Sequence, residues 1–158
     1  MMIDTTGTDG PVVDMITRFR APRDKLFKTW TQPELVSKWF MAAPGYLPAL
    51  VDLSLQELGA WKITVRPGSD VGQSIIGGNF FQIVPGRELA YSWSGNIPGG
   101  EYYTLVNARF EEGDNGGSQL RLTHGVFRTG ADRDAHADGW TLCLHGLARA
   151  LGEEPDAS

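Results

Sequence analysis

The feature that most constrains the fold is a long amphipathic segment near the C-terminal end of the chain, residues 138–151, "DGWTLCLHGLARAL". Its apolar residues recur at helical spacing on one stripe: Trp140, Leu144, Leu147 and Leu151. A helix of about 20 residues is about 30 Å long, which is enough to lie across a sheet. The pattern therefore predicts a long helix packed on a sheet, with Thr129 or Asp132 capping its start.

The middle of the chain reads as short strands joined by tight turns. Apolar and polar residues alternate in seven segments: 11–20, 49–58, 60–67, 73–84, 87–95, 101–112 and 118–127. Pro85-Gly86 and the "GDNGG" at 113–117 are typical of hairpin turns. Because the links are short, they favour an antiparallel meander over a parallel sheet.

Two short helices are predicted between the first and second strands. Pro22 and Pro33 are at positions where each helix would begin, and the apolar residues that follow them keep helical spacing. Residues 41–48 are expected to form a mobile loop. We therefore predict an α+β, helix-grip fold: a curved antiparallel sheet of about six to seven strands, wrapped on a long C-terminal helix.

Length and composition indicate one globular domain. We expect a flexible N-terminal arm at 1–11, a single domain at 12–151 and a C-terminal tail at 152–158. The net charge is −5 and the 14 basic residues are scattered, which argues against nucleic acid as a partner. No segment resembles a signal peptide or a membrane span, so no membrane insertion is expected. The single cysteine, Cys143, favours a reducing compartment, and hence a cytoplasmic protein.

Several segments, in order, resemble one known family. "APRDKLFKTWTQPELVSKWF", "VPGREL", "LRLTH" and "GWTLCLHGLARAL" are similar to landmarks of the domain family named after the activator of Hsp90 ATPase. That family is part of the START-related, helix-grip superfamily. The resemblance implies a deep pocket between the curved sheet and the C-terminal helix, which in relatives binds apolar or amphipathic small molecules. Some members of the wider superfamily are polyketide cyclases, and others are carriers or sensors.

Eight residues are candidates for the wall of such a pocket: Trp39, Phe40, Trp61, Tyr91, Trp93, His124, Trp140 and Leu144. Tryptophan and tyrosine offer a large apolar body and one polar group, which suits a mixed ligand. The alternative is that these side chains only fill the core. No motif for a cofactor is present, so none is expected. We expect no metal either, because His136 and His145 would lie on opposite sides of one helix.

His124 is the best polar candidate, since Leu120, Leu122, His124 and Val126 should share the inward face of one strand. An inward histidine could satisfy its nitrogens within the core, contact a ligand, or act as an acid or base with Tyr91 as its partner. Cys143 reads as a small core residue rather than a nucleophile, because nothing nearby in sequence would lower its pKa.

Gly139 is unusual because glycine weakens a helix interior by about 1 kcal/mol relative to alanine. We expect its missing side chain to allow close approach of a neighbouring element. Leu142, on the outer face of the same helix, is either one exposed leucine or part of a homodimer contact.

Three functions remain open. The first is a protein that binds a small apolar or aromatic ligand without chemistry of its own. The second is an enzyme of the polyketide cyclase or dehydratase type that uses a pocket histidine, and the third is an Hsp90-related interaction protein. The 158 residues leave no room for the separate N-terminal domain of the eukaryotic activator, which counts against the third function.

Overall fold

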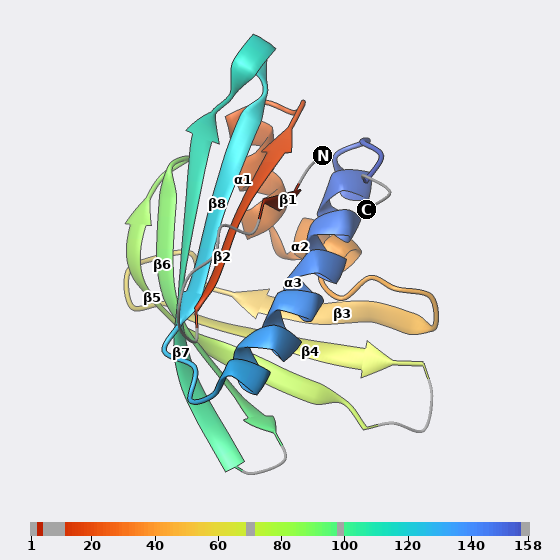
Figure 1. Ribbon diagram of the computed structural model, residues 1–158, viewed down its shortest axis with the longest axis vertical. Coiled ribbons are helices and arrows are strands. Elements are labelled where there is room, and N and C mark those ends of the chain that lie inside the picture. The colour runs from red at the N-terminus through yellow and green to blue at the C-terminus, as the bar shows by residue number, and fades with distance from the viewer. Residues whose placement is uncertain (1–2, 5–11, 69–71, 98–99, 156–158) are drawn as a thin grey trace.

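An eight-stranded antiparallel sheet curls around one long helix in the computed structural model, which describes residues 3–4, 12–68, 72–97 and 100–155 (Figure 1). The strand order is β1-β2-β8-β7-β6-β5-β4-β3. The strands are β1 (Ile3–Asp4), β2 (Val13–Phe19), β3 (Tyr46–Leu53), β4 (Ala60–Pro67), β5 (Ser74–Val84), β6 (Glu88–Ile97), β7 (Gly100–Glu112) and β8 (Ser118–Gly125). The helices are α1 (Arg23–Thr31), α2 (Pro33–Trp39), the 3₁₀ turn η1 (Asp114–Gly116) and α3 (Gly130–Ala150).

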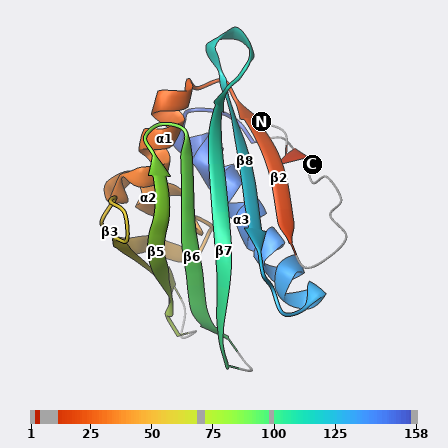
Figure 2. The same cartoon turned by 90° about the vertical axis from the view of Figure 1, so that its left-hand side faces the viewer.

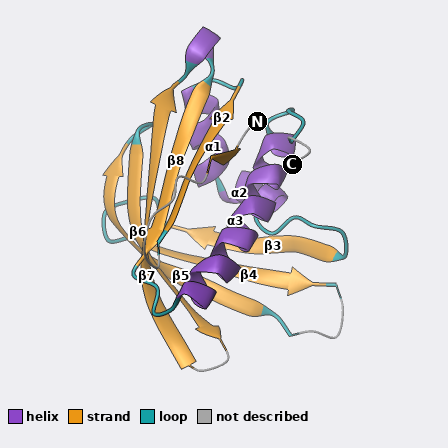
Figure 3. Ribbon diagram, viewed as in Figure 1, coloured by secondary structure: helices purple, strands orange, loops and turns teal. Residues whose placement is uncertain are grey.

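All the helices except η1 lie on the concave side of the sheet. Figure 3 shows α3 crossing that side, with α1 and α2 between its C-terminal half and the sheet. In the view of Figure 2, the strands β5, β6, β7, β8 and β2 lie in front of α3. One helix is narrower than the sheet, so α1 and α2 close one end of the space beneath α3 and leave the other end to loops and strand termini.

The predicted helix-grip fold is confirmed. The predicted apolar stripe of α3 is buried at all four positions, and the Thr129 hydroxyl caps the helix by accepting a hydrogen bond of 3.1 Å from the Asp132 amide. The seven longer strands correspond to the seven predicted segments, and β1 adds a two-residue edge. The rest of the predicted arm, residues 1–2 and 5–11, lies outside the described residues. None of the described helices is both long and apolar enough to cross a bilayer.

Two details of the prediction were wrong. β3 lies earlier than the strand predicted at 49–58: it begins at Tyr46, where it pairs with the end of β4, and it ends at Leu53, so the loop predicted at 41–48 is also shorter. Val126 does not share the inward face of β8. The strand ends at Gly125, Val126 has a φ of 67°, and its side chain is 64% exposed. A positive φ turns the chain away from the strand direction, so the alternation stops there.

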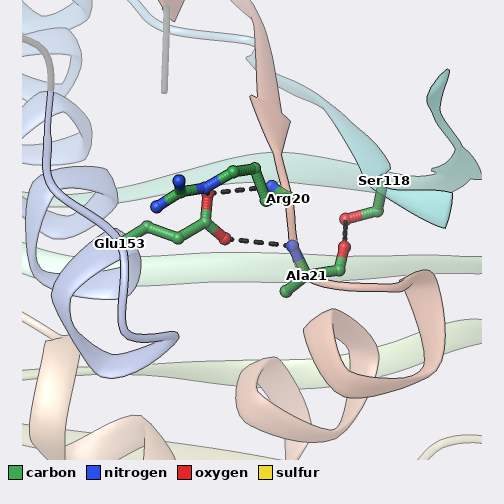
Figure 4. Close-up of polar contacts among 4 residues, drawn as sticks. All are labelled: Arg20, Ala21, Ser118 and Glu153. Atoms are coloured by element: carbon green, nitrogen blue, oxygen red, sulfur yellow. Dashed lines mark hydrogen bonds and ion pairs between the residues drawn. The ribbon is translucent and has the colours of Figure 1, made fainter. Parts of the chain in front are cut away.

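The C-terminal end of the chain is held by Glu153, a buried carboxylate within the predicted tail (Figure 4). Its two oxygens accept hydrogen bonds from the amides of Arg20, at 2.8 Å, and Ala21, at 3.1 Å. On the other side of the same junction, the Ser118 hydroxyl donates to the Ala21 carbonyl at 2.7 Å. These contacts satisfy backbone groups where β2 turns into α1 and connect that turn to the end of α3 and to β8.

Candidate ligand-binding site

The five tryptophans of the chain form one continuous series of ring contacts on the concave side of the sheet. Successive centroids are 4.8 Å apart between Trp39 and Trp30, 5.8 Å between Trp30 and Trp140, 5.3 Å between Trp140 and Trp93, and 5.3 Å between Trp93 and Trp61. The series begins on α2, passes through α1 and α3, and ends on β6 and β4. Indoles from five elements therefore pack together at the centre of the fold.

The indole groups of Trp30, Trp39, Trp61 and Trp140 have hydrogen-bond partners within the protein. Trp39 donates to the Thr29 carbonyl at 2.9 Å, and Trp61 donates to the Ser92 carbonyl at 3.0 Å. Trp30 hydrogen-bonds the side chain of Tyr91. A buried indole N–H without an acceptor is costly, so these bonds fix the rotamers of large side chains that would otherwise fit in several ways.

His124 lies behind this series and is completely buried. Its Nδ1 is 3.0 Å from Trp140 Nε1, and its Nε2 is 2.7 Å from Thr104 Oγ1. Because an indole nitrogen can only donate, Nδ1 must accept and the proton must be on Nε2. His124 Nε2 then donates to Thr104, whose hydroxyl donates to the Trp93 carbonyl at 2.9 Å. The chain of bonds runs from Trp140 through His124 and Thr104 to Trp93.

Burial keeps His124 neutral. Burial lowers the pKa of His124 to about 3, and the neighbouring His136 ring adds to the shift. Burial also raises the pKa of the Tyr91 hydroxyl, against the opposing effect of its hydrogen bond with Trp30. Both groups therefore keep their neutral forms at physiological pH. Both ring nitrogens of His124 are hydrogen-bonded to other side chains of the core. This geometry agrees with the first of the three interpretations given above, in which the histidine is a core residue whose nitrogens are hydrogen-bonded within the protein.

An inner chamber of about 40 Å³ lies under the tryptophan series. All five tryptophans border it, together with aliphatic and aromatic residues of the sheet such as Ile63, Phe80 and Leu89. A drug-sized ligand needs roughly 300–1,000 Å³. The inner chamber is therefore filled by the protein's own side chains.

A larger outer pocket of about 320 Å³ lies beside the N-terminal half of α3. Its walls come from α3, the ends of β4 and β5, and the turn between α2 and β3. The described lining residues are Phe40, Met41, Tyr46, Val65, Pro67, Gly72, Ser74, Ile76, Trp93, Ala135, His136, Gly139, Trp140 and Cys143. Phe40, Trp93 and Trp140 also border the inner chamber, so these three rings separate the two spaces.

The outer pocket has an uncharged wall, with aspartate, glutamate, lysine and arginine all absent from the described residues that line it. Its polar side chains are Tyr46, Ser74 and His136, and His136 Nδ1 donates to the Asp132 carbonyl at 2.8 Å. The described part of the chain contains no group of three or more His, Cys, Asp or Glu that could hold a metal ion. Such a wall favours an apolar ligand with a few neutral hydrogen-bonding groups.

Six of the eight candidate residues border the inner chamber: Trp39, Phe40, Trp61, Tyr91, Trp93 and Trp140. Three of these, Phe40, Trp93 and Trp140, also face the outer pocket. His124 and Leu144 are completely buried behind the aromatic layer and border neither space. The structure thus brings six of the candidates together around one chamber and places the other two in the core.

Sequence reasoning missed most of the outer pocket. It is lined by Met41, in the turn after α2, and by Tyr46, Val65 and Ile76 on the three successive strands β3, β4 and β5. Trp30, which joins Trp39 to Trp140, was not among the eight predicted pocket residues. Its apolar spacing with Leu26 and Phe27 was the one available signal that it points inward.

The expectation for Gly139 was wrong. A Cβ added to Gly139 would have no atom within 4 Å, because the residue faces the outer pocket. The close approach is at Gly146 instead, where an added Cβ would lie 2.7 Å from the Trp39 carbonyl oxygen. Cys143 is buried, and burial raises the pKa of its thiol to about 12, against an opposing hydrogen bond from the Met41 amide. A thiol in this state is a poor nucleophile.

Solved structures with the same fold come from several bacteria. A Rhodobacter sphaeroides protein matches with a TM-score of 0.81 and 19% identity over 96% of this chain and 98% of that one. An Arthrobacter aurescens protein matches with a TM-score of 0.77 and 14% identity over 99% of this chain and 94% of that one. A Chromobacterium violaceum protein matches with a TM-score of 0.75 and 18% identity over 92% and 99%. At these identities the likeness shows the fold alone.

A family model supplies the identification. No match was found among curated protein sequences. The model described as "Activator of Hsp90 ATPase homolog 1-like protein" matches residues 20–152, which is most of the chain. The match begins just before α1 and ends just after α3, so it includes every helix and all of the sheet except β1 and β2. The chain therefore belongs to the family of Activator of Hsp90 ATPase homolog 1-like proteins.

Proposed function

We propose that this protein binds a small apolar or amphipathic molecule between the sheet and α3, without chemistry of its own. The observation that carries the proposal is the outer pocket, a space of about 320 Å³ with an uncharged described wall and three aromatic rings at its inner end. Concave, mostly apolar spaces of this size with a few polar groups are typical of small-molecule sites.

The geometry gives no support to the cyclase-type alternative. An enzyme of this type needs two titratable side chains that can reach the ligand, and the predicted pair was His124 and Tyr91. Both nitrogens of His124 are hydrogen-bonded within the protein, and the Tyr91 side chain is buried and hydrogen-bonded by Trp30. The co-chaperone alternative has only the family's name in its favour. A homodimer through Leu142 stays a prediction, since this side chain is half-buried within the single chain.

Native mass spectrometry of the protein as purified from cells tests the proposal. We expect a small molecule to be retained by the wild-type protein. Two neighbouring residues of β5 provide matched variants: Ile76 lines the outer pocket, whereas Ile75 is 56% exposed. Ile76→Lys should lose the bound molecule because a buried ammonium group excludes an apolar ligand. Ile75→Lys should keep it.

Two results would contradict the proposal. One is a wild-type protein that carries no small molecule and takes up none from a panel of uncharged aromatic and aliphatic compounds. The other is a retained molecule that survives Ile76→Lys and is lost with Ile75→Lys, because that pattern would locate the ligand outside the outer pocket.

A further inference from the structure

Two glycines of α3 are in opposite surroundings. Gly146 is required by packing, because an added Cβ would lie 2.7 Å from the Trp39 carbonyl oxygen and 3.2 Å from Trp39 Cα. Gly139 meets no such contact within 4 Å. Glycine destabilises a helix interior relative to alanine, so Gly139 carries a cost that no close contact offsets.

The position of Gly139 suggests what offsets this cost. Gly139 lines the outer pocket together with three other residues of α3. His136 lies about one turn before it, Trp140 is the next residue, and Cys143 lies about one turn after it. The missing side chain leaves open space between the helix backbone and the pocket at this position. Any larger residue at this position would project its side chain into that space.

We propose that Gly139 is a specificity-determining residue of the outer pocket, and that the ligand it admits is an uncharged, planar aromatic molecule with a hydrogen-bonding group at one end. This inference rests on the proposed function and deepens it by naming the class of ligand and the residue that selects it.

The aromatic rings at the inner end of the pocket indicate a planar ligand. Trp93 lies between Phe40, with centroids 6.0 Å apart, and Trp140, with centroids 5.3 Å apart. The ring planes are tilted by 37° and 50° to one another, so the three rings form an angled aromatic wall rather than a parallel stack. Aromatic ligands gain from such offset and edge contacts beyond their apolar burial. A flat ligand can also lie against the helix where Gly139 leaves no side chain.

The polar residues indicate the charge of the ligand. The described wall offers two hydroxyl groups, on Tyr46 and Ser74, and the ring of His136, but no permanent charge. Burying an ionised ligand without a partner of opposite charge is strongly unfavourable. Tyr46 is 37% exposed, so it lies toward the open side of the pocket. The hydrogen-bonding group of the ligand is therefore expected at that end, with its rings against Trp93 and Trp140.

Isothermal titration calorimetry with two matched compounds tests the inference. 2-Naphthol is planar and uncharged at neutral pH and carries one hydroxyl group, and naphthalene-2-sulfonate has the same rings with a negative charge. We expect the wild-type protein to bind 2-naphthol at least about tenfold more tightly than the sulfonate. Gly139→Leu should weaken 2-naphthol binding by at least about tenfold. Asp138→Leu, at an exposed neighbouring position of α3, should bind like the wild type.

Thermal unfolding separates lost binding from lost folding. Gly139→Ala should raise the Tm by about 2–4 °C, because alanine favours the helix and the space beside it is open. Gly139→Leu should also be at least as stable as the wild type. Its weaker binding then reflects a filled pocket rather than an unfolded protein.

Each contrary outcome would overturn one part of this proposal: the role of Gly139, the charge of the ligand or the class of the ligand. If Gly139→Leu binds 2-naphthol as tightly as the wild type, or if Gly139→Ala lowers the Tm, Gly139 does not border an open pocket. If the sulfonate binds as tightly as 2-naphthol, the ligand is not restricted to uncharged molecules. If the wild type binds neither compound, the ligand class is wrong, while the molecule retained in native mass spectrometry decides the proposed function separately.

Discussion

The two halves of the space under α3 use the same sheet and helix in opposite ways. Beneath the C-terminal half, α1 and α2 intervene, five indoles fill the core, and the inner chamber is only about 40 Å³. Beneath the N-terminal half no helix intervenes, and a pocket of about 320 Å³ remains. The boundary is formed by Phe40, Trp93 and Trp140. A helix-grip fold therefore does not require a single deep cavity, because aromatic packing can fill one end and leave the other open.

The hydrogen bonds show the same difference. At the filled end, Trp39, Trp61 and Trp140 each donate to an acceptor within the protein. At the open end, the hydroxyls of Tyr46 and Ser74 border the pocket. Matched polar groups fix a rigid core, whereas polar groups on a pocket wall can orient a ligand.

Removing one indole from within the tryptophan series should give the largest effect. Trp30 stacks between Trp39 and Trp140, so Trp30→Ala leaves a void in the filled half. We expect a loss of about 3–5 kcal/mol in the free energy of unfolding, measured by urea denaturation. Phe81→Ala, at a side chain that is 50% exposed on β5, should change it by less than about 1 kcal/mol. Equal losses would mean that the tryptophan series is not the core.

Replacing the buried histidine should have the next largest effect. In His124→Phe the Trp140 N–H loses its acceptor, and the Thr104 hydroxyl loses its donor. We expect a loss of roughly 2 kcal/mol at neutral pH, because a buried donor is left unsatisfied. His145→Phe, at a half-buried position of the same helix, is the matched control and should be close to neutral. A neutral His124→Phe would contradict the hydrogen-bond chain.

The contribution of His124 should also depend on pH. Its pKa is about 3 in the folded protein and near its ordinary value of 6.5 when unfolded. Between these values the unfolded chain binds a proton that the folded chain does not, so stability present above pH 6.5 is lost as the pH falls. The advantage of the wild type over His124→Phe should shrink by about 1.5 kcal/mol between pH 6.5 and pH 5.

Urea denaturation of both proteins at several pH values measures this change. His136, whose ring is 5.3 Å from that of His124, is present in both proteins, so the comparison isolates His124. An advantage that stays constant with pH would mean that His124 keeps an ordinary pKa in the folded state.

The two glycines give the smallest but sharpest contrast. Gly146→Ala forces a Cβ against the Trp39 backbone, at a cost of about 1–3 kcal/mol that exceeds the roughly 1 kcal/mol gained in helix propensity. Gly139→Ala should gain the same helix propensity without a steric clash, because no atom lies within 4 Å of the added Cβ. Thermal unfolding of the two variants should therefore give Tm shifts of opposite sign, and shifts of the same sign would remove the contrast between the two halves.

Periodicity was enough to predict the fold, and it identified the inward side chains of the long elements. Trp140, Leu144 and Leu147 were found because a helix repeats every 3.6 residues, and Leu120 and Leu122 because a strand repeats every two. The outer pocket could not be found in this way. Met41, Val65 and Ile76 meet only after the sheet has curled, and periodicity does not give curvature. The same limit explains Gly139 and Gly146, because no local pattern tells which of two helix glycines faces a neighbouring backbone.

Glu153 illustrates a second limit. Its partners, Arg20 and Ala21, are more than 130 residues away in sequence. A glutamate in a Gly-, Glu- and Pro-containing tail has the composition of a solvated segment, and only tertiary structure brings it to a turn with unpaired amides. Buried polar contacts between distant segments are therefore the part of the fold that sequence patterns predict least.

The most direct test of binding in the outer pocket is a nitrogen-15 NMR titration of the five indole N–H resonances with 2-naphthol, each resonance assigned by a Trp→Phe variant. Trp93 and Trp140 border the outer pocket, whereas Trp39 and Trp61 border the inner chamber and are absent from the wall of the outer pocket. Binding in the outer pocket predicts the largest shifts for Trp93 and Trp140 and small shifts for Trp39 and Trp61. Largest shifts for Trp39 and Trp61, or no shifts at saturating 2-naphthol, would contradict it.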